Sequence, residues 1–147
     1  MLAMRELFTT QIRNRLTRKG FTPRLVEDSI HRLHAEGALD DRRAAAAYAW
    51  NAVQIKSRGR RRTLRELGDL GVSPHDAQQA VDEAYAAVSE EVLLTRVLNR
   101  RLTGPIETRA QFRRLYGALL RQGFESTAVV AALKAKTVSA LESGDDS

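Results

Sequence analysis

The sequence contains no cysteine among its 147 residues. Disulfide bonds and thiolate zinc sites are therefore excluded, and this absence fits a protein of the reducing cytoplasm. No apolar run approaches the roughly 20 residues that a membrane-spanning helix needs. The start of the chain, Met1 to Glu6, lacks a secretory hydrophobic region and is soon charged. We therefore expect a cytoplasmic protein that does not contact a membrane.

Aromatic residues are scarce, at 5% of the chain. A surface that stacks nucleic-acid bases normally presents several aromatic side chains on one face, so the low content argues against such a platform. The tryptophan and the three tyrosines fall within helical patterns. We predict that they lie in the core or between helices. They are Tyr48, Trp50, Tyr85 and Tyr116.

Motifs of catalysis and cofactor binding are also missing. The chain has no glycine-rich phosphate loop, no nucleophile elbow and no cluster of Ser, His and acid that suggests a triad. His31 and His34 share a helix face with Glu27, but a tight metal site needs further ligands, and the only other histidine is His75. The sequence thus argues against an enzyme and predicts neither a cofactor nor a metal site.

What the chain does contain is a threefold repeat. Gly20, Gly71 and Gly123 lie 51 and 52 residues apart. In each copy an apolar residue lies four positions before the glycine, and others lie one, six and ten positions after it. A fixed period of this size indicates tandem supersecondary units. Seven of the periodic residues are predicted to be buried: Leu16, Val26, Ile30, Leu67, Val81, Leu119 and Leu133.

Each copy is predicted to be a helix, a glycine turn and a second helix. The glycine ends the first helix in the left-handed conformation, and the next residue (Phe21, Val72 or Phe124) packs back on that end. Thr22 and Ser73 then cap the second helix, with proline at its first position. In the third copy the cap is Glu125 or Ser126. A third helix follows in two copies, starting at Asp40-Asp41 and at Ser89-Glu90-Glu91.

No segment alternates between apolar and polar residues over a strand length, so we predict an all-α fold. Tandem three-helix repeats of this kind form an elongated, curved helical array. The predicted repeats span 1–57, 58–103 and 104–142, the last truncated, with a frayed tail at 143–147. The predicted helices lie near residues 4–19, 23–36, 41–56, 61–70, 74–87, 90–102, 108–122 and 126–141.

Charge is concentrated in one segment. Lys56 to Arg65 holds six basic residues and no acid, and the formal net charge of the whole chain is also +6. Clustered cations favour a polyanionic partner because they displace counterions from phosphates; the alternative is a solvated loop and exposed helix start. We expect replacement of the five arginines here to leave the fold intact. The candidate contacts are Lys56, Arg58, Arg60, Arg61, Arg62 and Arg65, with Arg100, Arg101, Arg113 and Arg114 as further basic clusters of either structural or contact role.

The ordered set of motifs resembles the RecX family of regulatory proteins. The resemblance covers about residues 10 to 135 and rests on five stretches: Arg15 to Pro23, Leu33 to Asp41 with Tyr48, Gly59 to Leu67, Gly71 to Pro74, and Arg114 to Phe124. It implies tandem three-helix repeats that lie in the groove of the RecA–DNA filament. It also implies a monomeric regulator, without enzymatic activity, that inhibits the ATPase, coprotease and strand-exchange activities of RecA, by blocking filament growth or favouring disassembly.

Two other functions remain open from the residues. Helix–glycine–helix units are similar to helix-turn-helix elements, so the chain could bind DNA or RNA directly. Against this, the helix after each turn is not basic: Arg24 to Asp28 is mixed, and the charge lies before the turn. The third possibility is a scaffold for another protein.

Overall fold

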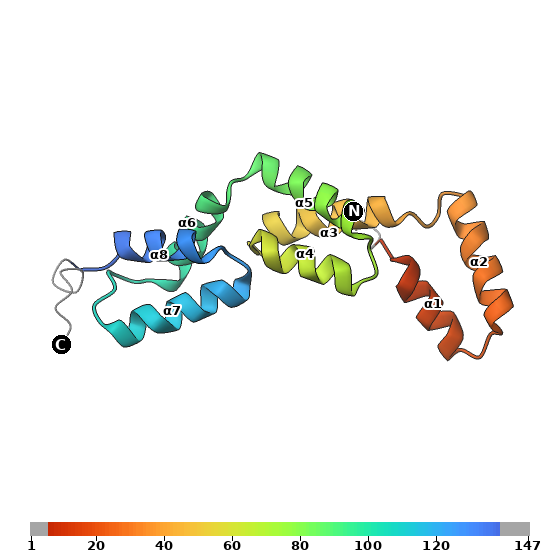
Figure 1. Cartoon of the computed structure of the whole chain (residues 1–147), viewed down its shortest axis with the longest axis horizontal. Helices are drawn as coiled ribbons and strands as arrows, with labels where there is room; N and C mark the ends of the chain where they lie inside the picture. Colours follow the sequence, from red (N-terminus) through yellow and green to blue (C-terminus); the bar gives the residue numbers. More distant parts are fainter. Residues whose placement is uncertain (1–5, 139–147) are drawn as a thin grey trace.

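The computed structural model describes residues 6–138, and in that part of the chain every regular element is a helix. The eight helices are α1 (Thr9–Arg18), α2 (Pro23–Ala35), α3 (Asp41–Gln54), α4 (Arg60–Asp69), α5 (Pro74–Ala87), α6 (Glu90–Arg101), α7 (Arg109–Gln122) and α8 (Ser126–Ala135). The array is elongated and curved, with α1 and α2 at one end and α7 and α8 at the other (Figure 1). The predicted all-α fold is confirmed.

The three repeat glycines end their helices in the same way. Gly20, Gly71 and Gly123 have φ of 94°, 88° and 105°. The amide of the next residue donates back to the carbonyl five positions earlier in all three copies, with N···O distances of 3.2, 3.0 and 3.2 Å. This left-handed motif satisfies carbonyls that a helix end leaves free. The period read from the sequence therefore marks one local structure used three times.

The predicted caps are present as well. The side chains of Thr22 and Ser73 accept hydrogen bonds from the amides of Leu25 and Asp76, with proline following each cap. Asp40 accepts from two amides of α3, and Ser89 accepts from the Val92 amide. In the third copy the cap position is Glu125, and its side chain makes no capping bond. Seven of the eight helix starts were predicted to within one residue, and side-chain caps account for those of α2, α3, α5 and α6.

Two helix ends differ from the prediction. The first helix starts at Thr9 rather than near residue 4, because Phe8 is extended and its side chain is buried, with its ring edge against Tyr48 at 6.3 Å. The last helix ends at Ala135 rather than 141. Ile106 and residues 136–138 pair there instead, through N···O bonds of 2.7 and 3.0 Å. Residues 4 and 5 of the first predicted helix, residues 139–141 of the last one and the tail predicted at 143–147 lie outside the described part.

The apolar core divides into two clusters. The larger one runs through α3 to α8 and includes Phe8, whereas the smaller one holds Val26, Ile30 and Leu39 between α1 and α2. Packing also crosses the predicted repeat boundaries. Helix α3, which the sequence period assigns to 1–57, packs mainly on α5 and also on α4, while α8 packs on α7 and α6. The division into 1–57, 58–103 and 104–142 stays a prediction from the sequence period.

The exposure of the predicted core residues differs between the two apolar clusters. Six of the seven residues predicted to be buried are so, but Leu16 is only partly buried. Phe21 was predicted to pack on its helix end and is 48% exposed, whereas Val72 and Phe124 are buried. The reason is that α1 and α2 form a core of two helices with one side open, while the later copies are covered by a neighbouring bundle.

One aromatic prediction is wrong. Tyr85 is buried and Tyr48 and Tyr116 are half-buried, but Trp50 is 58% exposed. Helix α3 buries the face that carries Ala45, Ala49 and Val53, and Trp50 lies on the opposite face. None of the helices within residues 6–138 has the length and apolar composition that crossing a membrane requires.

Candidate functional site

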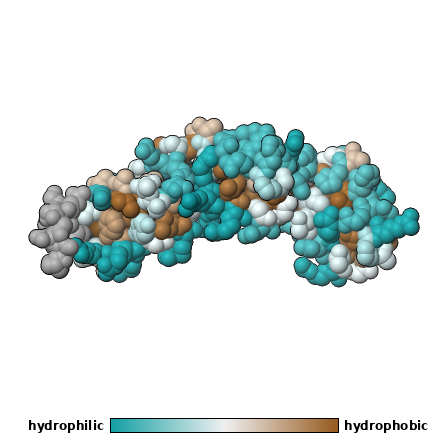
Figure 2. Space-filling model, in the orientation of Figure 1, coloured by the Kyte–Doolittle hydropathy of each residue, from teal (hydrophilic) through white to brown (hydrophobic). Residues whose placement is uncertain are grey.

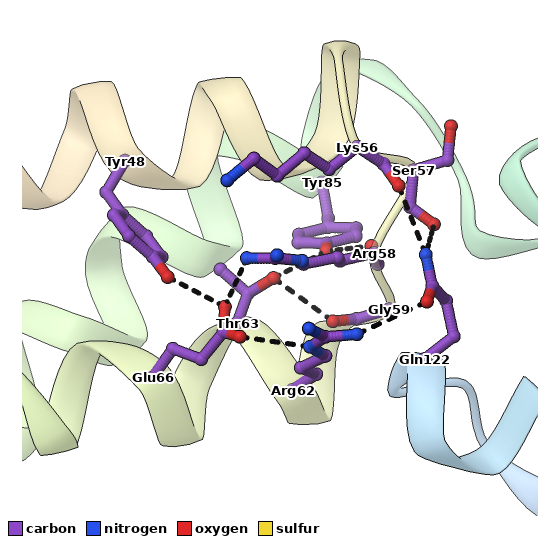
Figure 3. Close-up of polar contacts among 10 residues, drawn as sticks. All are labelled: Tyr48, Lys56, Ser57, Arg58, Gly59, Arg62, Thr63, Glu66, Tyr85 and Gln122. Atoms are coloured by element: carbon purple, nitrogen blue, oxygen red, sulfur yellow. Dashed lines mark hydrogen bonds and ion pairs between the residues drawn. The ribbon is translucent and has the colours of Figure 1, made fainter.

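The basic run forms the turn between α3 and α4 and the first turns of α4, where it surrounds one carboxylate. Glu66 accepts hydrogen bonds from Tyr48 Oη at 2.8 Å, Arg58 Nη1 at 2.8 Å and Arg62 Nε at 2.9 Å (Figure 3). The side chains of Arg58 and Glu66 are 17% and 21% exposed. Two guanidinium groups and a phenol thus converge on one partly buried carboxylate.

These contacts set the pKa of Glu66. Burial alone raises it, but hydrogen bonds from Tyr48 and Arg62 and the charges of Arg58 and Arg62 outweigh burial, so the pKa lies below its ordinary 4.5. Burial, followed by the bond to Glu66, raises the pKa of Tyr48 above 10.0. Glu66 is therefore a carboxylate that balances part of the positive run at neutral pH.

Two of the three remaining arginines of α4, Arg60 and Arg61, are also paired. Arg60 binds Asp82 at 2.6 Å and lies 5.6 Å from the ring centre of Tyr85, and Arg61 binds Glu125 at 2.9 Å. Tyr85 in turn donates from its hydroxyl to the Arg58 carbonyl. The premise that all five arginines lie at an exposed loop and helix start is wrong for Arg58 and Arg62, which the structure holds in a partly buried network. That their replacement leaves the helical fold intact stays a prediction. Lys56 and Arg65 are exposed and make no ion pair within residues 6–138.

The same segment joins the middle helices to the C-terminal ones. The Gly59 amide donates to the Gln122 carbonyl at 2.9 Å, and the Gln122 side chain donates to the Lys56 carbonyl at 3.1 Å. A Cβ on Gly59 would stand 2.2 Å from the Gly123 oxygen, so the two glycine turns touch through their backbones. Ser57 is buried with φ of 50° and accepts from Arg100 at 2.9 Å. The basic run therefore acts first as a junction between α4 and the α7–α8 turn (Figure 3).

Charge is distributed by helix in a regular way. The helices that precede the three repeat glycines, α1, α4 and α7, contain eleven arginines and two acidic residues, a net charge of +9. The other five helices contain eight cations and eight acids. In Figure 1, α1, α4 and α7 lie along the lower side of the arch. We call these three helices the basic edge.

Equivalent positions of the repeats carry the same cation. Counted from the repeat glycines, Arg61 corresponds to Arg113, Arg62 to Arg114, and Arg18 to Arg121. Arg113, Arg114 and Arg121 on α7 are exposed and make no ion pair within the described residues. Arg101, at the end of α6, is exposed as well. Within the basic edge, free positive charge therefore lies on α7 and on Arg15 and Arg18 of α1, whereas most of the charge on α4 is balanced within the chain.

The histidine cluster is engaged in ordinary contacts. Glu27 binds Arg13 at 2.8 Å, and His34 Nε2 lies 3.0 Å from the Thr9 hydroxyl. Within residues 6–138, no group of three or more metal-binding side chains gathers. The sequence did not identify two features that matter here: the role of Glu66, and the exposed pair Trp50 and Ile55. Glu66 could have been found from its spacing, because it lies four residues after Arg62 on one helix face.

The structure defines a class of protein, a solenoid of helix–glycine–helix units with one basic edge. Its similarity to known proteins identifies the family. No family model matches the chain. It is 34% identical over 127 residues to the regulatory protein RecX of Treponema pallidum strain Nichols, covering 83% of this chain and 77% of the relative. It is 32% identical to RecX of Thermotoga maritima, covering 88% and 75%, and 31% identical to RecX of Amycolatopsis mediterranei, covering 84% and 71%.

A crystal structure of the regulatory protein RecX superposes with a TM-score of 0.72 at 19% identity, covering 88% of this chain and 64% of that one. The structural match supports the fold, and the sequence identities show the family. The chain belongs to the RecX family of regulatory proteins.

Proposed function

We propose that this chain is a non-enzymatic regulator that inhibits a RecA recombinase by lying along the RecA–DNA filament. The observation that carries the proposal is the basic edge, which repeats its charge once in each helical unit along one side of a curved array. A filament offers negative charge at regular intervals, so a periodic row of cations suits it. The regulator needs no cofactor and acts as a monomer in the cytoplasm, by blocking filament growth or by favouring disassembly.

The basic residues fall into two groups. The exposed cations without ion pairs in the described part of the chain, Lys56, Arg65, Arg113, Arg114 and Arg121, can approach a polyanion without breaking internal bonds. Arg58, Arg60 and Arg62 serve chiefly to hold the junction, because each already binds a carboxylate within the chain. Arg61 belongs to the second group because it binds Glu125, and Arg100 donates to Ser57 at the same junction. Arg101 is exposed without an ion pair in the described residues and belongs to the first group.

The central test is ATP hydrolysis by the cognate RecA on single-stranded DNA, with and without this protein. We expect inhibition that weakens as salt rises. The variant with Arg113→Gln, Arg114→Gln and Arg121→Gln should bind the filament more weakly. Its slope of log K against log salt should fall by up to about 0.7, the value for single-stranded DNA, for each phosphate that the variant no longer neutralises.

A matched control removes three exposed arginines elsewhere. Arg24→Gln, Arg32→Gln and Arg96→Gln together make the same change in net charge on α2 and α6, outside the basic edge. This control should retain most of the inhibition. Equal inhibition by the α7 variant and the parent across a range of salt would show that α7 does not contact the filament.

The second candidate is a module that binds DNA directly. The basic edge favours it too, because exposed arginines contact phosphates in any nucleic acid. Salt-sensitive binding to naked duplex DNA, with no effect on RecA activity, would select this function. Absence of binding to both DNA and recombinase would select a scaffold for another protein.

A further inference from the structure

A groove opens between α1, α3 and α4, apart from the cations of the basic edge. Its volume is about 1160 Å³, and Phe8, Ala47, Tyr48, Trp50, Ile55 and Leu70 supply its apolar lining. We call the groove defined by this lining the Trp50 groove. In the space-filling view the molecule is hollowed on its lower side, between the end formed by α1 and α2 and the middle (Figure 2).

The two most exposed large apolar side chains described in the protein lie in this groove. Trp50 is 58% exposed and Ile55 is 62% exposed. Both belong to the end of α3 or the residue just after it, and the exposed Ala46 and Ala47 lie one turn before Trp50. Packing within the chain does not use these side chains. Tryptophan is enriched among residues that dominate protein–protein binding, so an exposed tryptophan in a groove indicates an interaction surface.

The charges in the groove do not suit a nucleic acid. Its lining contains two cations, Lys56 and Arg58, and three acids, Glu6, Glu66 and Asp69. Arg58 is already bound to Glu66. A phosphate backbone would find no surplus of positive charge here, whereas an apolar segment of a protein would bury Trp50 and Ile55.

The groove has ends of opposite charge. Lys56 lies just after α3, and Asp69 ends α4, which returns along α3 from the intervening turn. Glu6 also lies at the Asp69 end, but it is paired with Arg43, so Asp69 supplies the unbalanced negative charge there. A helix carries a partial positive charge at its N-terminus and a partial negative charge at its C-terminus. The charges therefore complement a helix that runs parallel to α3, with its N-terminus toward Asp69.

The length of the groove agrees with a short helix. The α3 residues that line it begin at Ala44, and the lining continues to Ile55 just after the helix, a distance of ~17 Å at the helical rise per residue. About three turns of a partner helix would match this length. An amphipathic helix presents apolar residues at i, i+3, i+4 and i+7, which is the usual way that such grooves are filled.

We propose that the Trp50 groove binds a short amphipathic helix of a partner protein, oriented parallel to α3, with apolar side chains packed on Trp50 and Ile55. The groove gives the regulator an anchor on protein, separate from the phosphate contacts of the basic edge. The choice of recombinase as the first partner to test rests on the function proposed above.

The first experiment uses Trp50 as its own reporter, because it is the only tryptophan of the chain. The protein labelled with 5-fluorotryptophan should give one ¹⁹F resonance, which shifts when the cognate RecA filament on single-stranded DNA is added. Single-stranded or duplex DNA alone should leave the resonance in place. A shift with DNA alone would overturn the proposal in favour of a nucleic acid in the groove. A shift that depends only on the concentration of this chain would overturn it in favour of a second copy.

Variants measure how much the groove contributes. Trp50→Ala with Ile55→Ser should weaken filament binding tenfold or more, as for residues that dominate an interface, and should leave the salt slope unchanged. The control, Leu25→Ala with Val92→Ser, changes two other apolar residues that are 53% and 47% exposed and should bind as the parent does. Filament binding by the Trp50 and Ile55 variant at the parent's affinity would overturn the proposal.

A second experiment separates this inference from the proposed function. A displayed library of twelve-residue amphipathic helices is selected on the parent protein and counter-selected on the Trp50→Ala variant. Enriched helices that shift the ¹⁹F resonance support the groove even if the parent fails to bind the RecA filament, in which case only the proposed function is wrong. If no helix is enriched and the filament leaves the resonance in place, the groove proposal is wrong.

Discussion

Glu66 offers the sharpest test of how this fold holds its own positive charge. Its carboxylate accepts hydrogen bonds from Tyr48, Arg58 and Arg62, at donor–acceptor distances of 2.8, 2.8 and 2.9 Å. The substitution Glu66→Gln keeps the size of the side chain and removes its charge. The two guanidinium groups, which are 17% and 28% exposed, then lack the carboxylate that they share. We expect the folded state to be destabilised while its helical structure is retained.

The expected size of the effect lies between two known limits. Exposed ion pairs contribute up to about 1 kcal/mol, whereas breaking a fully buried pair costs about 3–5 kcal/mol. The Glu66 network is about one fifth exposed, and it includes two charged hydrogen bonds that glutamine can only partly replace. We therefore expect a decrease of about 2 kcal/mol in the free energy of unfolding at pH 7, as for hydrogen bonds to charged groups.

The dependence on pH follows from the lowered pKa of Glu66. A carboxyl group whose pKa is lower in the folded state stabilises the fold above its unfolded pKa, and this contribution is lost as the pH falls through the folded value. The window therefore lies below about pH 4.5, the ordinary value for the group. The parent should lose stability in that window, and the variant should lack this part of the decrease. The difference between the two proteins should shrink as pH falls from 7 to about 3.

Urea unfolding followed by circular dichroism at several pH values measures this difference. Glu91→Gln is the matched control, because Glu91 is exposed on α6 and makes no ion pair within the described residues. The control should change stability by less than about 0.5 kcal/mol. A Glu66 variant as stable as the control at pH 7, or a difference that stays constant down to about pH 3, would refute the role given to Glu66.

Three further predictions concern the fold. Gly59→Ala should destabilise the protein by about 1–3 kcal/mol, because the new Cβ would stand 2.2 Å from the Gly123 carbonyl oxygen. The control Gly68→Ala, on open helix surface, should be neutral or slightly stabilising. Urea unfolding compares the two variants, and equal stability would show that the two turns can separate freely. Leu67→Ala, at a fully buried position, should lower the free energy of unfolding by about 2–5 kcal/mol. Leu16→Ala, in the two-helix core of α1 and α2, should lower it clearly less. The reverse order in the same assay would contradict the assignment of the two cores. Solution X-ray scattering should give a radius of gyration above the roughly 15 Å of a compact domain of this length, and a value at or below it would exclude an elongated array.

The local structure could be predicted from the sequence because each signal acts within a few residues. Gly71 and Gly123 adopt positive φ as their position demands, and Thr22, Ser73 and Asp40 cap the helices that follow them. The errors arose where distant segments meet. Phe8 leaves the first helix because its side chain enters a core supplied by α3 and later helices, and the final helix stops where residues 136–138 meet Ile106. No local pattern encodes either contact.

The candidate site was predicted less well for the same reason. The sequence locates the basic run, but Asp82, Glu90 and Glu125, which bind Arg60 and Arg61, lie more than twenty residues away from them. The number of cations counted in the sequence of a segment is therefore larger than the positive charge that the folded segment leaves unpaired. The helical pattern around Trp50 predicts a core position, since periodicity does not show that α3 has a face left open by its neighbours.

These findings separate two roles that the sequence had assigned to one segment. A cation that is already bound to a carboxylate gains less from a phosphate, because the internal bond must first be given up. On α4 that condition applies to Arg60, Arg61 and Arg62, whereas Arg113, Arg114 and Arg121 on α7 make no ion pair in the described part of the chain. Since α4 and α7 are equivalent helices of successive repeats, one basic pattern serves in α4 to join two bundles and in α7 to present charge outward. The salt dependence of filament binding should therefore respond more strongly to α7 than to the segment with the highest density of arginine.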